Sequence, residues 1–279
     1  MLVKSFSKIN LTLTVNQKLK NKNLHEIQSY YCLTNLFDQI KVKKIKGQKD
    51  IVKFKGRFSK FIKKRNNSII DALNILREHN FISNFYSILV KKNIPVFSGM
   101  GGGTSNAFFL TKYLKKKKLD KKLKNIFCKK IGSDFSLFFY EQGFLKNLKK
   151  INKLNKKHKL YFLLVYPDFR CSTEDIYSKV TKYSLQTKYN FKKIDDNSKF
   201  IRYLRDKNND LQAIVENKFP IIKKLIKEIK QKKGCYFSRL TGSGSVCYGV
   251  FQSERLAKIA LNRIKTKYPK FWFSVAKTI

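Results

Sequence analysis

The sequence predicts an α+β protein made of two closely packed domains. Its 279 residues are enough for two hydrophobic cores of ordinary size. Strand-like and helix-like segments follow one another throughout, and 42% hydrophobic with 14% aromatic residues indicates folding despite a formal net charge of +44. A lysine-rich stretch of weak periodicity at 145–159 places the division between residues 1–155 and 156–279.

The first half of the chain mixes strand and helix signals. Residues 2–15 alternate polar and apolar side chains, as a half-buried strand does. Ile69, Leu73 and Leu76 recur at helical spacing after the capping candidate Asn67. The expected strands are 2–15, 40–45 and 85–91, and the expected helices are 67–80, 105–114 and 121–130.

The second half continues this mixture. The apolar run 135–140 reads as a strand, so Asp134 is expected at a helix-to-strand junction. The further expected strands are 160–165, 246–251 and 271–275, and the further expected helices are 221–229 and 256–264.

The positive charge is spread along the chain and does not form a separate basic arm. A strongly basic chain favours an anionic partner such as nucleic acid. Lys, Asn, Ile and Phe are all abundant, however, which an AT-rich coding sequence produces across a proteome, and runs such as 41–46 read as solvated faces. We therefore expect a small-molecule partner, no nucleic acid, no membrane, and a monomer or homodimer.

The chain shows no signal for export or membrane insertion. Its apolar runs stay below the ~20 residues of a membrane helix, and the first 15 residues alternate in polarity instead of forming a secretion signal. Five cysteines are scattered without the close spacings of metal sites. We expect free thiols in a reducing cytoplasm.

The segment 95–106 carries the strongest chemical signal. It places four glycines within positions 99–103, directly before an expected helix. Glycines let backbone N–H groups converge on an anion, and the helix N-terminus adds partial positive charge. Thr104 and Ser105 are expected to cap the helix and to contact phosphate or its metal. The loop is no Walker motif, because Gly-Lys-Ser and Gly-Lys-Thr are absent, and Thr104 breaks the dinucleotide pattern.

A second glycine turn lies at 238–245, with the sequence Ser-Arg-Leu-Thr-Gly-Ser-Gly-Ser before an expected strand. Alone it is compatible with a plain hairpin turn. Together with the first glycine segment it favours a site for a phosphorylated ligand.

Four segments occur in the order typical of the GHMP kinase superfamily: 7–11 with Lys8, 95–106, 132–134 with Asp134, and 238–245. The chain resembles that superfamily from end to end and, within it, the 4-diphosphocytidyl-2-C-methyl-D-erythritol kinase family. The resemblance implies an N-terminal ribosomal-protein-like α/β domain and a C-terminal ferredoxin-like α+β domain, with the active site between them. It also implies ATP-dependent phosphorylation of the substrate's 2-hydroxyl in non-mevalonate isoprenoid biosynthesis.

The same resemblance implies roles for single residues. Asp134 would accept the proton of the substrate's hydroxyl, and Lys8 would keep the Asp134 carboxylate ionised. Mg²⁺ would bridge the ATP phosphates near Thr104 and Ser105 without a dedicated set of protein ligands. ATP would contact Asn67, Pro95, Gly99, Met100, Gly101, Gly102, Gly103, Thr104, Ser105 and Asn106. The cytidine substrate would contact Asn10, His25, Thr173, Tyr177, Thr241, Gly242, Ser243 and Gly244.

Two departures from the family pattern stand out. Leu24 occupies the position before His25 where the family usually has Tyr, so one side of the expected base sandwich is apolar. After Gly143 a lysine-rich stretch replaces the family's small-residue turn. Three alternatives stay open: a homoserine or mevalonate type of GHMP kinase, a basic nucleic-acid-binding protein, and a member that binds nucleotide without catalysis.

Overall fold

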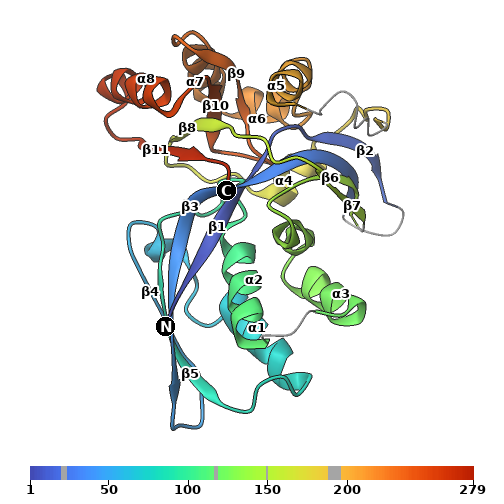
Figure 1. Cartoon of the computed structure of the whole chain (residues 1–279), viewed down its shortest axis with the longest axis vertical. Helices are drawn as coiled ribbons and strands as arrows, with labels where there is room; N and C mark the ends of the chain where they lie inside the picture. Colours follow the sequence, from blue (N-terminus) through green and yellow to red (C-terminus); the bar gives the residue numbers. More distant parts are fainter. Residues whose placement is uncertain (20–23, 116–118, 149, 188–195) are drawn as a thin grey trace. The chain divides into compact units, whose positions relative to one another are not determined.

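The computed structural model describes residues 1–19, 24–115, 119–148, 150–187 and 196–279. The chain divides into two compact units (Figure 1). Unit 1 comprises Met1–Lys8, Leu36–Val96 and Gly101–Phe139, and unit 2 comprises Ile9–Asn35, Phe97–Met100 and Tyr140–Ile279. The expected division into domains 1–155 and 156–279 remains a prediction, because the two compact units are each made of several separate segments.

Unit 1 combines a small sheet with helices. The last part of strand β3 (His25–Ile45) pairs antiparallel with β5 (Phe85–Lys91), and β5 pairs parallel with β4 (Ile51–Lys55). The first residues of β1 (Leu2–Asn10) also belong to this unit. Its helices are α1 (Ser68–Glu78), α2 (Gly102–Lys115), α3 (Lys121–Lys130) and the 3₁₀ helices η1 (Ser59–Phe61) and η2 (Ser133–Phe139).

The core of unit 1 is built largely of phenylalanine. Helix α2 packs against α1 and against η2, and α3 also packs against η2 (Figure 1). Phe127 of α3 stacks on Phe135 of η2 with ring centroids 4.7 Å apart, and Phe108 of α2 meets Phe135 edge-on at 5.3 Å. All three rings are buried.

The expectation of a strand at 135–140 was wrong, because these residues form η2. A strand would turn Phe135 and Phe138 to opposite faces, whereas three residues per turn place them on the same side. Both rings contact Phe108 in this arrangement, and Phe135 N donates to Gly132 O at 3.0 Å. Packing of aromatic rings therefore decides the conformation of this apolar run.

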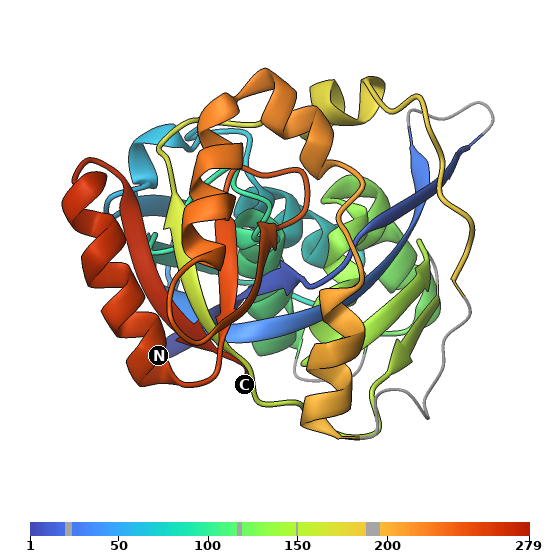
Figure 2. The same cartoon turned by 90° about the horizontal axis from the view of Figure 1, so that it is seen from above.

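Unit 2 contains a sheet with two helices packed on it. Its strand order is β11 (Trp272–Lys277), β8 (Tyr161–Tyr166), β10 (Cys247–Phe251) and β9 (Cys235–Leu240), and all neighbours are antiparallel. Helix α7 (Pro220–Lys230) packs on β9 and β10, and α8 (Glu254–Lys267) packs on β8 and β11 (Figure 2). Apolar residues such as Ile222, Leu225 and Ile229 give α7 its buried face.

The remaining strands of unit 2 pair with the first part of β3. They are β2 (Thr14–Lys18) and β6 (Gln142–Asn147), and β7 (Lys150–Lys153) pairs in turn with β6. The other helices of the described part of the unit are α4 (Thr173–Ser178), α5 (Asn197–Arg205) and α6 (Gln212–Lys218).

The predicted mixture of strands and helices is confirmed. Asn67 caps α1 as expected, since its side chain accepts hydrogen bonds from Ile69 N and Ile70 N, both at 3.2 Å. The expected strand 2–15 is interrupted, because Leu11 N and Thr12 N both donate to Tyr30 O and the regular ladder ends at Asn10.

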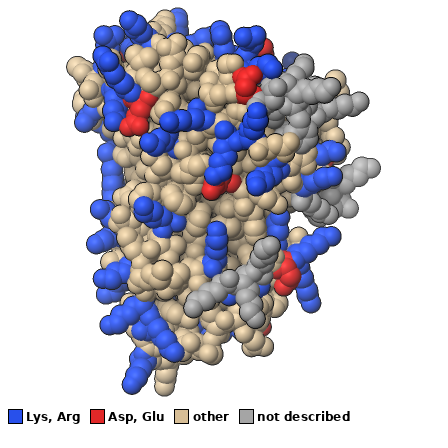
Figure 3. All heavy atoms as spheres, viewed as in Figure 1, with Lys and Arg blue, Asp and Glu red and all other residues tan. Residues whose placement is uncertain are grey.

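Lys and Arg are spread over the visible face of the molecule with few acidic side chains between them (Figure 3). The run 41–46 shows the pattern predicted for a solvated strand, because Lys41, Lys43, Lys44 and Lys46 are exposed while Val42 is buried. None of the helices in the described part of the chain has the length and apolar character that a membrane crossing requires.

Removing the Phe135 ring should destabilise the protein strongly. Phe135→Ala is expected to cost about 3–5 kcal/mol, because the ring is fully buried and contacts rings from α2 and α3. Leu185→Ala is the control, since Leu185 is 93% exposed and should change stability by less than about 0.5 kcal/mol. Urea unfolding measures both, and equal stabilities would contradict the packing described for η2.

Candidate active site

The glycine segment leads directly into helix α2, which begins at Gly102. The first intrahelical bond runs from Ser105 N to Gly101 O at 2.8 Å. The N–H groups of the three preceding residues, Gly102 to Thr104, therefore have no acceptor within the helix. Such groups, with the partial positive charge of a helix N-terminus, suit an anion like phosphate.

Lys8 and Asp134 form an ion pair beside this helix start. Lys8 Nζ lies 3.1 Å from Asp134 Oδ2, and the side chains are 4% and 34% exposed. Strand β1 supplies the lysine, and η2 supplies the aspartate at its first turn. One ammonium is thus buried against a carboxylate that solvent can reach.

Gly101 keeps this pair next to the loop. Its φ is +67°, a region that favours glycine, and an added Cβ would lie 3.2 Å from Lys8 Cγ and 3.2 Å from Phe138 Cζ. The stem of Lys8 therefore passes directly beside the backbone of Gly101. An ammonium, a carboxylate and unpaired amides meet in one place within unit 1.

Thr104 and Ser105 both lie in the helix and do not cap it, so the capping expectation was wrong for both residues. The helix begins three residues before Ser105, because the glycines themselves take helical conformation. Ser105 is fully buried, its hydroxyl donates to Phe6 O at 2.6 Å, and it lies 2.7 Å from Ser5 Oγ. These contacts connect α2 to β1. Thr104 is half-buried and lies near Gly132.

The other expected ATP contacts of unit 1 have structural partners. Asn67 Nδ2 donates to the backbone oxygens of Lys63 and Lys64, in addition to the cap described above. Gly103 O accepts from Ser68 Oγ at 2.7 Å, which connects the starts of α1 and α2. Asn106 and Pro95 are buried.

The two glycine motifs meet inside unit 2, to which Gly99 and Met100 belong. An added Cβ on Gly99 would lie 2.0 Å from Thr241 O, and the φ of Gly99 is +76°. Thr241 is fully buried, and its Oγ1 accepts from Asn10 N at 3.0 Å. The second turn is therefore held against the first glycine segment and against the end of β1.

Several side chains shape the turn of residues 241–244. Asn209 Nδ2 donates to Leu240 O at 2.9 Å and to Gly242 O at 2.8 Å. Gly242 and Gly244 both have positive φ, and Gly244 N donates to Thr241 O at 3.0 Å. Ser243 Oγ lies 2.9 Å from Thr173 Oγ1 at the start of α4. The structure thus brings the predicted contacts Asn10, Thr173, Thr241, Gly242, Ser243 and Gly244 into one region.

His25 and Tyr177 form an aromatic group in the same unit. Their ring centroids lie 5.2 Å apart, and the ring of Tyr183 lies 6.2 Å from His25 at an interplanar angle of 28°. His25 Nδ1 is buried and has no hydrogen-bond partner among the described residues. Burial, and secondarily the charge of Lys18, lower the pKa of His25 below its ordinary value, so its ring is neutral at pH 7. Leu24 is 47% exposed.

Sequence reasoning missed Tyr183 and a buried polar network of Asp38, Lys92 and Asn106. Tyr183 lies in a segment without regular secondary structure, so no periodic pattern in the sequence singles it out. Asp38 gave one usable signal, since it follows a run of uncharged, mostly apolar residues in a chain with 18 acidic residues. Lys92 gave none, because lysine is common throughout the sequence.

The described residues offer no cluster of three or more His, Cys, Asp or Glu side chains for a metal ion. Mg²⁺ commonly keeps several waters and uses one or two carboxylates together with substrate phosphates. The solvent-accessible carboxylate of Asp134 and the hydroxyl of Thr104 fit a magnesium ion that arrives with a nucleotide.

The chain is similar to known kinases over its full length. The model of the GHMP kinases C-terminal family matches residues 189–270. A 4-diphosphocytidyl-2-C-methyl-D-erythritol kinase of Pelagibacter ubique is 36% identical over 282 residues, covering 99% of this chain and 98% of the relative.

Solved structures share the fold. A crystal structure of 4-(cytidine 5'-diphospho)-2C-methyl-D-erythritol kinase superposes with a TM-score of 0.77 at 19% identity, covering 99% of both chains. Homoserine kinase from Cytophaga hutchinsonii superposes with a TM-score of 0.68 at 15% identity, covering 100% of this chain and 94% of the other.

A side chain at position 99 should disrupt the contact between the two glycine motifs. Gly99→Ala is expected to lower stability by about 3 kcal/mol or more, because its Cβ overlaps a backbone oxygen and its φ is strained. Gly47→Ala is the matched control, since its nearest neighbour is a side-chain atom 3.9 Å away. If thermal unfolding finds both variants equally stable, the close approach of Gly99 and Thr241 does not exist in solution.

Proposed function

We propose that this chain, which belongs to the 4-diphosphocytidyl-2-C-methyl-D-erythritol kinase family, phosphorylates the 2-hydroxyl of that cytidine diphosphate with ATP. The products are the 2-phosphate and ADP, in the non-mevalonate route to isoprenoid precursors. The observation that carries the proposal is the ion pair of Lys8 and Asp134, 3.1 Å apart, beside Gly101 at the start of α2.

The start of α2 binds the ATP phosphates. Gly102, Gly103 and Thr104 carry N–H groups without intrahelical acceptors, and Gly103 is exposed while Gly102 is buried. Phosphoryl transfer requires mainly positioning and stabilisation of charge on the phosphate oxygens. Backbone amides fixed by a helix supply both.

Asp134 is the general base, and Lys8 stabilises charge in the reaction. The carboxylate accepts the proton of the attacking hydroxyl, for which its solvent-accessible position is suited. The ammonium of Lys8, held at 3.1 Å, orients the carboxylate and attracts the incoming phosphoryl oxygens. When bound with the nucleotide, Mg²⁺ would neutralise phosphate charge, and Asp134 and Thr104 would be the protein side chains that could hold it.

The aromatic group of unit 2 binds the cytosine base. Tyr177 and the neutral His25 present ring faces and a free imidazole nitrogen, which suits stacking and hydrogen bonding to a base. The buried turn of residues 241–244, with Asn10 beside it, contacts the remainder of the substrate.

A comparison of alcohols tests the proposal against its relatives of the same fold. An assay that couples ADP release to NADH oxidation should show turnover with the cytidine diphosphate substrate, ATP and Mg²⁺. Homoserine and mevalonate should give a kcat/KM that is about 10- to 10²-fold lower, because they lack the base that the aromatic group binds. Stacking of one base contributes about 1–3 kcal/mol. Faster turnover of either small alcohol would refute the assignment of substrate.

Replacing the base should remove catalysis and leave nucleotide binding intact. Asp134→Asn keeps the shape of the side chain but cannot accept the proton, so kcat should fall by about 10²–10⁴-fold. The dissociation constant of ADP should stay within about threefold, because the α2 amides are unchanged. Glu78→Gln removes an exposed acid at the end of α1 and should keep full activity. Full turnover by Asp134→Asn would end the assignment of Asp134.

A further inference from the structure

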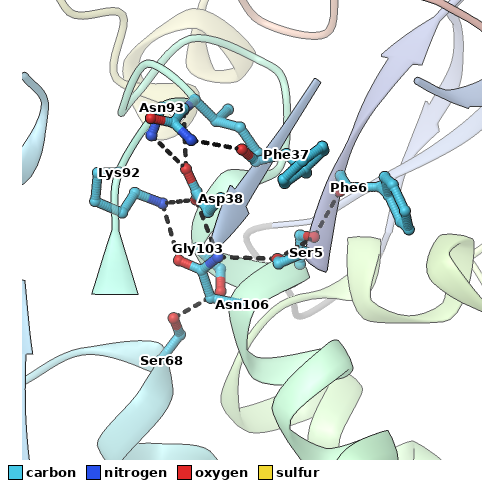
Figure 4. A network of polar contacts seen from close by, with 11 residues as sticks. Ser5, Phe6, Phe37, Asp38, Ser68, Lys92, Asn93, Gly103 and Asn106 are labelled. Carbon is cyan, nitrogen blue, oxygen red and sulfur yellow. Dashed lines mark hydrogen bonds and ion pairs between the residues drawn. The ribbon is translucent and has the colours of Figure 1, made fainter. Parts of the chain in front are cut away.

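Asp38 is the centre of a buried polar network in unit 1 (Figure 4). Its Oδ1 accepts from Asn93 N at 2.7 Å and from Ile94 N at 2.9 Å. Its Oδ2 accepts from Lys92 Nζ in a very short contact and from Asn106 Nδ2 at 3.0 Å. The carboxylate therefore fixes both the backbone after β5 and the first turns of α2.

The network continues from Asn106 to strand β1. Lys92 Nζ donates to Asn106 Oδ1 at 2.9 Å, so the amide of Asn106 has a charged partner on each side. Asn106 Nδ2 also donates to Ser5 Oγ at 2.9 Å, and Ser5 Oγ lies 2.7 Å from Ser105 Oγ. Strand β1 carries Lys8 three residues after Ser5. One network thus connects the strand of Lys8 to the helix whose start follows Gly101.

The central side chains of the network are buried, so neither solvent nor a partner at the surface contacts them. Asp38 and Lys92 have side chains that are 0% and 1% exposed, and Asn106 is 2% exposed. A buried ion pair is weak evidence for stability, because apolar residues of similar volume often stabilise a protein equally well or better. Directional, charge-assisted hydrogen bonds fix geometry more narrowly than apolar contacts. The pair therefore suits positioning better than it suits bulk stability.

Lys92 also lies against the helix start itself. An added Cβ on Gly102 would lie 3.4 Å from Lys92 Nζ and 3.1 Å from Ile94 Cγ2. Ile94 is in turn held by Asp38 through its backbone N–H. The first residue of α2 thus rests on two residues that Asp38 orients.

We infer that Asp38, acting through Lys92 and Asn106, is a positioning residue that sets the start of α2 and its unpaired amides in the geometry for binding nucleotide phosphate. The inference rests on the proposed role of α2 in the kinase reaction. It reassigns Asn106, expected as an ATP contact, to a buried connection between α2 and Asp38.

The test measures ADP affinity and thermal stability in parallel. Asp38→Asn leaves the Lys92 ammonium buried without a counter-charge, so both quantities should fall, with ADP binding about tenfold weaker by calorimetry. In Asp38→Asn with Lys92→Met, both charges are gone, so the midpoint of thermal unfolding should recover. ADP affinity should stay about tenfold below the wild type, because Asn106 has lost both charged partners.

Asp50→Asn is the matched control. Asp50 also pairs with a cation, Arg77 at 3.0 Å, and accepts from a backbone N–H, Tyr86 N at 2.8 Å, within the same unit. This variant should lower stability while ADP affinity stays within twofold of the wild type. Comparing the Asp38 and Asp50 variants separates the effect of losing an ion pair from the effect of displacing the start of α2.

The outcomes distinguish the two proposals. Wild-type ADP affinity in a folded Asp38 variant overturns the positioning role, as does recovery of both affinity and stability in the double variant. If neither Asp38 variant folds, Asn106→Ala keeps the ion pair and must still weaken ADP binding about tenfold, and wild-type affinity overturns the inference. Failure of the cytidine substrate to react, with these ADP results as expected, would refute the proposed substrate alone.

Discussion

The burial of Lys8 is the constraint on which the chemistry of unit 1 depends. An ammonium that is 4% exposed requires a counter-charge, and Asp134 provides it at 3.1 Å. A side chain at position 101 would press on the stem of the lysine, with Cβ 3.2 Å from Lys8 Cγ, and φ is also positive there. The glycine, the start of α2 behind it and the placement of Asp134 at the first turn of η2 are therefore parts of one arrangement.

A second buried lysine, Lys92, also has a carboxylate as its counter-charge, but this pair is closed to solvent. Lys92 is 1% exposed and pairs with Asp38, but both groups are enclosed and bonded to Asn106, and Asp38 also accepts from two backbone amides. Asp134, by contrast, is 34% exposed and accessible to reactants. In a chain with 62 Lys and Arg and 18 Asp and Glu residues, most lysines are solvated. The two buried lysines among the described residues of unit 1, Lys8 and Lys92, each pair with an aspartate. One pair is suited to proton transfer, and the other to holding the helix that binds phosphate.

Local patterns in the sequence predicted the local features of the site. The glycines of 99–103 indicated a helix start with free amides, and Asn67 indicated a cap, because both signals depend on neighbouring residues only. The pairing of Lys8 with Asp134 spans 126 positions, and no periodicity reports it, so only the resemblance to a family identified it. The Asp38 and Lys92 pair is 54 residues apart and had no such guide. The run 135–140 was misjudged because a short apolar segment fits a strand or a helical turn equally well until its packing partners are known.

The proposed reaction transfers a phosphoryl group to one particular hydroxyl. The name of the family's substrate places a methyl group on carbon 2, so a phosphate ester there has no hydrogen on its carbinol carbon. Proton-coupled ³¹P NMR of the product formed with ATP should then show, beside the diphosphate signals, one new monoester singlet. A doublet or a triplet from coupling to carbinol protons, or the absence of any new monoester, would contradict the proposed reaction.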